Sequence, residues 1–247
     1  GGVLWWEWGT GDGYFYEMTK DTENEGWFEI LLPSWGGDGG FNEIKFLGQN
    51  AWVSDLVEGV EWGVVDNSAA VQEIFKGSGS DVDALILPDL GKNPAYYKVR
   101  FNPNTEEYTA EEIIPTEAAP TEMYIVGKGF TAFPNLDWNP EEAIAMTPNP
   151  YEYGEYQFLV EGLEFSGDVA LKFIGQNTGW SPIDIGFDET YLVDADTDTD
   201  GWQIIAPVNW KPTKAGDGTA DLKFVDQAGT YTVYFDYFLM RAVVWPE

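Results

Sequence analysis

The chain has 247 residues, and 12 lysines and arginines against 43 aspartates and glutamates give it a net charge of −31. It contains no histidine and no cysteine. These counts exclude a Ser-His-Asp triad, a thiol nucleophile, a cysteine-ligated zinc site and a disulfide framework. The negative charge makes nucleic acid and anionic lipid poor partners. The 44% hydrophobic and 16% aromatic content predicts a folded core rather than a disordered chain.

Short β-strands are predicted along the whole chain. In chain order, the apolar or alternating runs that predict strands are 28–32, 97–101, 156–160 and 231–235. Between the first two, residues 69–75 have the pattern of a short helix. Turn residues are frequent, with 28 glycines and 14 prolines. Many short strands in about 120 residues per domain predict β-sandwiches.

A repeated segment divides the chain into two halves. Residues 44–50 (IKFLGQN) and 171–177 (LKFIGQN) are identical at five of seven positions and lie 127 residues apart. Further matches flank them, namely Met18-Thr19 with Met146-Thr147, 26–28 with 154–156, and 97–102 with 231–236. A period of this length predicts two duplicated domains rather than small solenoid units.

The sequence also indicates where one half ends and the other begins. Residues 111–120 contain two prolines and several small residues, which predicts a short, stiff, extended linker. We therefore place the two domains at 1–115 and 119–247. No segment approaches the roughly 20 apolar residues of a membrane helix. No basic-then-apolar signal peptide opens the chain, so we expect Gly1 to begin a mature or trimmed protein.

The repeated segment carries a candidate sugar site in each half. Alternation along a strand predicts that Phe46 and Phe173 face the core while Lys45 and Lys172 point to solvent. Pyranose rings stack their C–H faces on indoles, and ammonium and amide groups read their hydroxyls. The alternative is that the lysine protects a sheet edge, the amides form a turn and the tryptophan packs in the core. The two sets are Lys45, Gln49, Asn50, Trp52 and Lys172, Gln176, Asn177, Trp180.

Tryptophan is the most over-represented residue, with 12 in the chain. Trp35 lies beside the glycine-rich residues 36–40, and Trp138 lies in the loop-like residues 135–140. Exposed loop tryptophans are costly without a purpose, so both are candidate ligand contacts. We expect four others to be core residues, namely Trp27, Trp62, Trp202 and Trp245.

Acidic residues suggest two further sites, each with a simpler explanation. Asp196, Asp198 and Asp200 fit the first half of a calcium loop. The expected glutamate falls on Pro207, and no helices flank the segment, which favours a solvated acidic hairpin. Carboxylate pairs such as 141–142 and 188–189 follow from composition, and nothing in the sequence fixes a separation suited to glycoside hydrolysis. We therefore do not expect an enzyme.

The second half also contains a series of short motifs, namely 123–127 (MYIVG), 137–139 (DWN), 145–146 (AM), 154–156 (GEY), 171–173 (LKF) with Trp180, and 229–233 (GTYTV). In this order and spacing they resemble SusE/SusF-type domains. That family comprises surface glycan-binding lipoproteins of the outer-membrane polysaccharide-utilisation systems of gut bacteria. The resemblance covers essentially the whole second half and, more loosely, the first.

The resemblance implies an all-β protein of two tandem immunoglobulin-like or carbohydrate-binding-module-like β-sandwiches. It implies non-catalytic capture of a polysaccharide or oligosaccharide, with a starch-like α-glucan favoured and other components of an outer-membrane glycan-uptake complex as partners. We expect no cofactor, and calcium at the acidic loop stays the less favoured alternative to a solvated hairpin. The protein would be a cell-surface lipoprotein. The N-terminal module and lipidated cysteine of the family are absent from this chain, which fits a trimmed protein.

The family pattern also assigns residues. Trp138, Lys172 and Trp180 would contact sugar in the second domain, and Lys45 and Trp52 in the first. The first domain departs from the pattern, because residues 9–16 are shorter than 127–144 and lack the Asp-Trp pair. Trp8 or Trp35 would have to complete that platform. A second hypothesis stays open, a structural spacer or adhesin-like pair without a sugar site, which predicts few exposed tryptophans.

Overall fold

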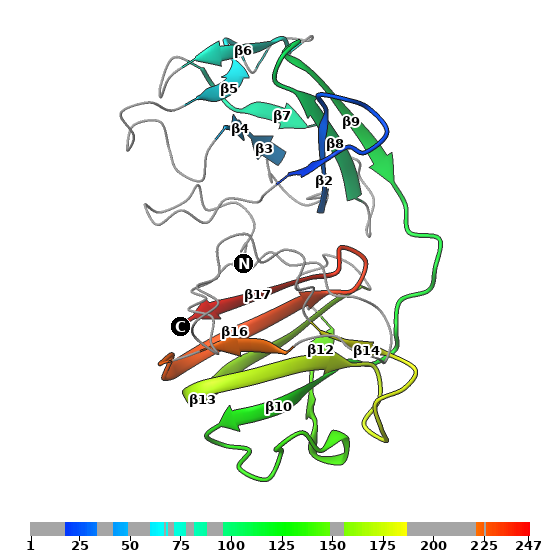
Figure 1. The fold of residues 1–247 in the computed structure, drawn as a ribbon, viewed down its shortest axis with the longest axis vertical. Coiled ribbons are helices and arrows are strands. Elements are labelled where there is room, and N and C mark those ends of the chain that lie inside the picture. The colour runs from blue at the N-terminus through cyan, green and yellow to red at the C-terminus, as the bar shows by residue number, and fades with distance from the viewer. Residues whose placement is uncertain are drawn as a thin grey trace. The chain divides into compact units, whose positions relative to one another are not determined.

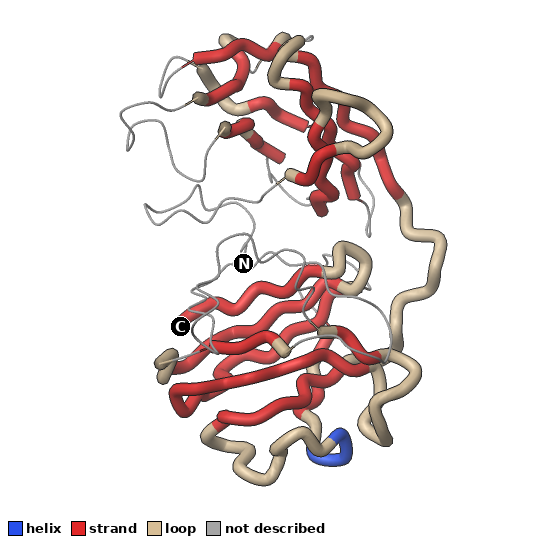
Figure 2. Tube along the Cα trace, viewed as in Figure 1, coloured by secondary structure: helices blue, strands red, loops and turns tan. Residues whose placement is uncertain are grey.

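The computed structural model describes residues 18–33, 42–48, 60–66, 68, 72–77, 82–87, 96–148, 156–186, 221–224 and 226–247. It divides into two compact units, residues 1–116 with 151–154, and residues 117–150 with 155–247. Within the described residues the regular structure is antiparallel β-sheet, joined by one turn of 3₁₀ helix at Pro140–Glu142 (Figure 2). None of the helical structure described is long and apolar enough to cross a membrane. The protein is therefore all-β, as the sequence predicts.

The first unit contains three small sheets (Figure 1). Their strand orders are β1-β2-β8-β9, β3-β7 and β4-β5-β6. The strands are β1 (Thr19–Lys20), β2 (Phe28–Pro33), β3 (Asn42–Ile44), β4 (Phe46–Leu47), β5 (Glu61–Val64), β6 (Ile74–Gly77), β7 (Leu85–Leu87), β8 (Tyr96–Asn102) and β9 (Glu107–Ile113).

An aromatic stack joins two of these sheets. The ring of Phe46 on β4 lies 4.1 Å from that of Phe101 on β8, with only 5° between their planes. Trp62 on β5 meets Phe101 edge-on at 5.3 Å. All three side chains are buried. Because the two rings come from different sheets, the core of this unit lies between them.

The second unit is built around one long strand. Its elements are β10 (Tyr124–Phe130), β11 (Ile144–Ala145), β12 (Thr147–Pro148), β13 (Gln157–Ile174), β14 (Asp184–Ile185), β15 (Leu222–Phe224), β16 (Gly229–Asp236) and β17 (Arg241–Pro246). The 18-residue β13 pairs with β10, β12, β14, β15 and β16. Residues 157–165 of β13 pair with β16, with a register shift between Val160 and Leu163, whereas β15 and most of β10 pair with residues 169–174.

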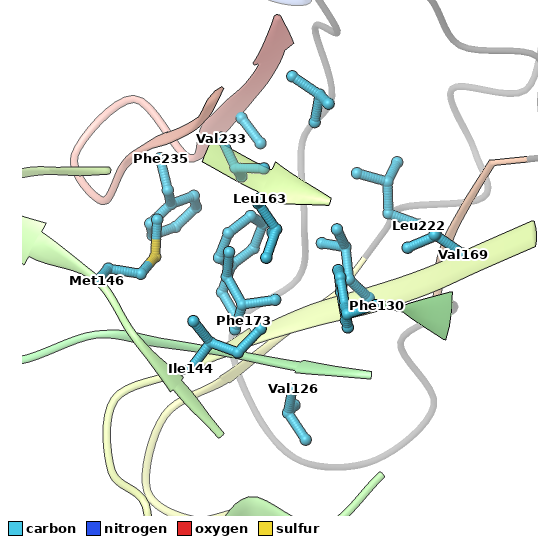
Figure 3. Packing of buried hydrophobic residues seen from close by; sticks show 14 of the residues in the cluster. Val126, Phe130, Ile144, Met146, Leu163, Val169, Phe173, Leu222, Val233 and Phe235 are labelled. Atoms are coloured by element: carbon cyan, nitrogen blue, oxygen red, sulfur yellow. The ribbon is translucent and has the colours of Figure 1, made fainter. Parts of the chain in front are cut away.

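The core of the second unit gathers side chains from all along β13 (Figure 3). Leu163, Val169 and Phe173 come from β13 itself, and Phe235 reaches them from β16. The rings of Phe173 and Phe235 stack at 4.5 Å with 16° between their planes. This pair therefore occupies the place that Phe46 and Phe101 hold in the first unit.

The strand registers support the duplication read from the sequence. Thr19 pairs with Glu29, and Thr147 pairs with Leu159. Each threonine hydroxyl donates to the carbonyl of its partner, at 3.3 and 3.2 Å. The β3–β7 pair likewise corresponds to the pairing of β13 with β15.

One match from the sequence is wrong by two positions. Phe28 pairs with Phe101, and Phe158 pairs with Phe235. Phe28 therefore corresponds to Phe158, so residues 26–28 do not align with 154–156. The two matches at 18–19 and 26–28 need different offsets, which a search at one fixed period cannot find.

The strand predictions at 28–32, 97–101 and 231–235 are confirmed by β2, β8 and β16, and β13 begins within the predicted run 156–160. The helix expected at 69–75 is wrong where the structure describes it. Ile74 and Phe75 belong to β6 and pair with Val64 and Gly63. The linker expected at 111–120 also begins too early, because β9 continues to Ile113.

Candidate functional site

Two loop tryptophans of the second unit meet at the protein surface. Trp138 follows β10 and Trp180 follows β13, 42 residues later in the chain. Their ring centroids are 6.3 Å apart and their planes are tilted by 31°. Trp180 is 36% exposed, which makes it one of the most exposed large apolar side chains described, and Trp138 is half-buried. The two indoles therefore form one aromatic patch, which we call the Trp138–Trp180 pair.

The loop after β10 is built to hold Trp138. Leu136 anchors the loop in the core with 1% exposure. Trp138 itself adopts a left-handed backbone with φ of 62°, a conformation that costs an L-residue roughly 1–2 kcal/mol. Its N–H donates to the carbonyl of Gly127 at 3.0 Å. A Cβ on Gly127 would lie 2.0 Å from the carbonyl oxygen of Ala170, so glycine allows β10 to approach β13 at this anchor point.

The loop that carries Trp180 is closed by a single side chain. The Nε2 of Gln176 donates to the carbonyls of Gly179 and Ile183 at 3.0 and 3.1 Å, and its Oε1 accepts from the Ile183 N–H at 3.3 Å. Gly175 allows the Ile183 side chain to pack against its backbone, 2.6 Å from where a Cβ would lie. Gln176 therefore shapes the loop, while the next predicted residue, Asn177, is exposed.

Lys172 does not point to solvent, so that expectation is wrong. Its side chain is 9% exposed and its Nζ lies 2.6 Å from Oδ1 of Asp184, whose side chain is 4% exposed. The same ammonium lies over the Trp180 ring, 5.4 Å from the centroid. Alternation along β13 correctly places Phe173 in the core, but the opposite face of the strand is covered as well. Lys172 is thus held between a carboxylate and an indole.

The first unit has the same ion pair. Lys45 Nζ lies 2.5 Å from Oε1 of Glu61, with side chains 14% and 1% exposed. Gly48 donates to the Val60 carbonyl at 2.9 Å, as Gly175 does to Ile183 at 3.1 Å. In both units the acidic residue is therefore the first one after the loop. The first loop is four residues longer than the second.

Other charges share the face of β13 that carries Lys172. Lys128 and Lys223 flank Ala170 on the two neighbouring strands. Asp221 precedes β15, and burial raises its pKa while the nearby Lys172 and Lys223 act in the opposite direction. Lys128, Lys172 and Lys223 therefore place three cations on one face of the sheet around β13.

Several predicted site residues lie outside the described residues. They are Trp8, Trp35, Gln49, Asn50, Trp52, Asp196, Asp198 and Asp200. Within the described ranges, no group of three or more acidic side chains is placed to hold a metal ion. The carboxylates of Glu141 and Glu142 are exposed on the 3₁₀ turn.

The structure thus brings together Trp138, Lys172, Gln176 and Trp180 from separate positions in the sequence. The sequence analysis missed Asp184 and its counterpart Glu61. A signal was present, since each acid directly follows the loop after the repeated Lys-Phe segment. The unequal loop lengths hid this correspondence. Comparison of the chain with models of known protein families gives no match, and neither does comparison with curated proteins.

Proposed function

We propose that this protein binds a polysaccharide without breaking bonds, and that the Trp138–Trp180 pair is the contact surface. The observation that carries the proposal is the exposed indole of Trp180 beside the half-buried indole of Trp138, which a separate loop brings to it. An exposed aromatic patch is unfavourable in water unless it meets a ligand. Sugar rings are suitable ligands, because their C–H faces stack on indole rings and their hydroxyls bond to nearby polar groups.

The favoured ligand is a starch-like α-glucan, which the SusE/SusF resemblance implies. The two rings are tilted by 31°, so they do not form one flat platform. Asn177, exposed in the same loop as Trp180, is available to bond hydroxyl groups.

The proposal includes the finer fold and the setting. Corresponding strand pairs and a corresponding aromatic stack in both units support two tandem β-sandwiches of immunoglobulin-like or carbohydrate-binding-module-like form. By the SusE/SusF resemblance, the protein acts at a bacterial outer membrane together with other components of a glycan-uptake complex. Weak sites on one chain can act together on a long polymer through effective concentration.

The alternative of a spacer without a ligand predicts few exposed tryptophans. Among the tryptophans whose burial is described, Trp180 is exposed while Trp27, Trp62 and Trp138 are not, so a binding measurement has to decide between the two functions. Affinity electrophoresis tests the proposal directly. The protein is run in gels cast with amylopectin, xyloglucan, xylan, fructan or mannan, and retardation by one of them is expected. Trp138→Ala and Trp180→Ala should each weaken binding by about 1–3 kcal/mol.

The matched control is Phe75→Ala, which removes an aromatic ring that is 40% exposed in the first unit. It should leave binding unchanged. Normal binding by Trp180→Ala, together with a much lower melting temperature, would contradict the proposal, since it would make the indole a structural residue. Free migration of the native protein in every gel would favour the spacer.

A further inference from the structure

The ion pair beneath Trp180 has a role that the family resemblance does not give it. In the starch-binding modules that the sequence resembles, the lysine of the Lys-Phe strand contacts sugar. Here the ammonium of Lys172 already has two partners, Asp184 at 2.6 Å and the Trp180 ring at 5.4 Å. A side chain that is 9% exposed offers little surface to a ligand. The geometry points to Lys172 as a positioning residue that holds the Trp180 ring for its ligand.

The ammonium of Lys172 lies over one face of the Trp180 ring. An ammonium over an aromatic face is attracted to it when it lies within about 6 Å of the centroid. Because Lys172 covers part of one face of Trp180, a sugar on this ring would stack on the surface that the lysine leaves open. The lysine therefore supports the ring from behind and does not share the ligand with it.

Lys172 is held by Asp184, which lies on β14 and outside the loop that carries Trp180. Asp184 is the first residue of β14, which pairs with β13, so the carboxylate is held by the sheet. A buried ammonium without a partner is strongly disfavoured. Asp184 therefore holds Lys172 in place, and Lys172 in turn fixes the indole. The position of the ring depends on the sheet as well as on the loop.

A lysine–carboxylate pair occurs in both units. Lys45 and Glu61 form the same pair in the first unit, at corresponding registers, although the loop between them is four residues longer. A lysine that read sugar hydroxyls would depend on the shape of the loop around it. An ion pair that fastens the base of the loop to the sheet does not, and the two copies retain it.

The role of Lys172 rests on the proposed function only in assuming that the ligand of Trp180 is a sugar. The effect of Lys172 on the ring can be tested first in the free protein, without a glycan. The full chain is labelled with 5-fluorotryptophan, and Trp180→Phe identifies the ¹⁹F resonance of Trp180 among the twelve tryptophans. Lys172→Met should shift and broaden that resonance in the free protein. Lys45→Met, the matched control, removes the corresponding ammonium in the other unit and should leave the Trp180 resonance in place.

A second variant guards against simple misfolding. Combining Lys172→Met with Asp184→Asn removes both charges, so no carboxylate is left buried alone. It should displace the Trp180 resonance while the resonances of the other tryptophans stay in place. Lys172→Arg keeps a cation over the ring and should restore a sharp signal. A Trp180 resonance that Lys172→Met leaves unchanged would overturn the inference, whether or not any glycan binds.

A binding cycle separates positioning from direct contact. With the retarding polysaccharide, Lys172→Met should weaken binding about 3- to 30-fold, the range of a cation–π contact. In a Trp180→Ala background, where no ring is left to position, the same change should cost little more. An equal loss in both backgrounds would show that Lys172 contacts sugar and would overturn the positioning role. Absence of binding by the native chain would overturn the proposed function, and the ¹⁹F result would still decide the role of Lys172.

Discussion

Replacing Phe173 by alanine should destabilise the second unit and leave the first unchanged. Phe173 and Phe235 are 0% and 1% exposed, and their rings stack at 4.5 Å. Removal of a buried phenylalanine costs about 3–5 kcal/mol, because its transfer energy is lost and a cavity is left. The stacking itself supplies about 0.5–1.5 kcal/mol of this. The loss is large beside the total stability of a domain, about 5–15 kcal/mol.

The matched variant is Phe46→Ala in the first unit. Phe46 is 5% exposed and stacks on Phe101 at 4.1 Å, so the expected loss is of the same size. Hydrogen exchange followed by mass spectrometry on the full chain can assign each loss to a segment. Phe173→Ala should lower the opening free energy of β13 and β16 by about 3–5 kcal/mol and leave β2 and β8 as they are. Phe46→Ala should do the reverse.

The reasoning fails if either variant lowers protection equally in both units. That result would mean that the two halves unfold as one cooperative body with a shared core. It also fails if the loss in the substituted unit is below about 1 kcal/mol, because a buried ring with a stacked partner cannot be removed so cheaply. The proposed function uses the two units as separate binding modules, so it depends on this independence.

Three further predictions concern single side chains. Gln176→Ala should lower stability by about 1–3 kcal/mol, since it removes three hydrogen bonds, and should speed exchange of the Ile183 amide; unchanged exchange would contradict the clamp. Hydrogen bonds from the Glu23 N–H and other groups lower the pKa of Asp21 from 3.8 to about 2. Asp21→Asn should therefore lower the melting temperature at pH 7, with a deficit that shrinks as the pH falls from about 4 to about 2; a constant deficit would refute this. Burial raises the pKa of Asp221 above 3.8, so its charged form opposes folding at pH 7. Asp221→Asn should raise the melting temperature there, and the gain should vanish once the pH falls below 3.8; a loss at pH 7 would show that its lysine neighbours outweigh burial.

Local pattern was enough to predict the strands and part of the core. Alternation in 97–101 and 231–235 predicts β8 and β16. Burial of every second side chain stabilises such a strand and offsets the conformational entropy that is lost when the chain is ordered. The same rule correctly buries Phe46 and Phe173. It failed at 69–75, where a short apolar run fits either helix or strand. The pairing of Ile74 with Val64 decided the outcome, and no local pattern contains that contact.

The candidate site was predicted in composition but not in geometry. Motif and loop context predict Trp138, Lys172 and Trp180 as site residues, and the structure brings them together. The environment of Lys172 could not be read from the strand on which it lies. Its burial requires Asp184, which arrives only after the intervening loop, and an indole that covers it. Sequence alternation gives the face to which a side chain points, whereas the cover over that face comes from elsewhere in the chain.

The two units differ in the loop that would contact a ligand, and they agree in the residues that stabilise the fold. The stacked phenylalanines, the lysine–carboxylate pair and the strand registers correspond, whereas the loop after the Lys-Phe segment differs by four residues. The left-handed Trp138 belongs to a loop for which the first half has no Asp-Trp counterpart. Equal scaffolds with unequal loops mean that affinity measured for one unit does not transfer to the other. The Trp138→Ala and Trp180→Ala variants therefore measure the second site alone, and any binding that survives both belongs to the first unit.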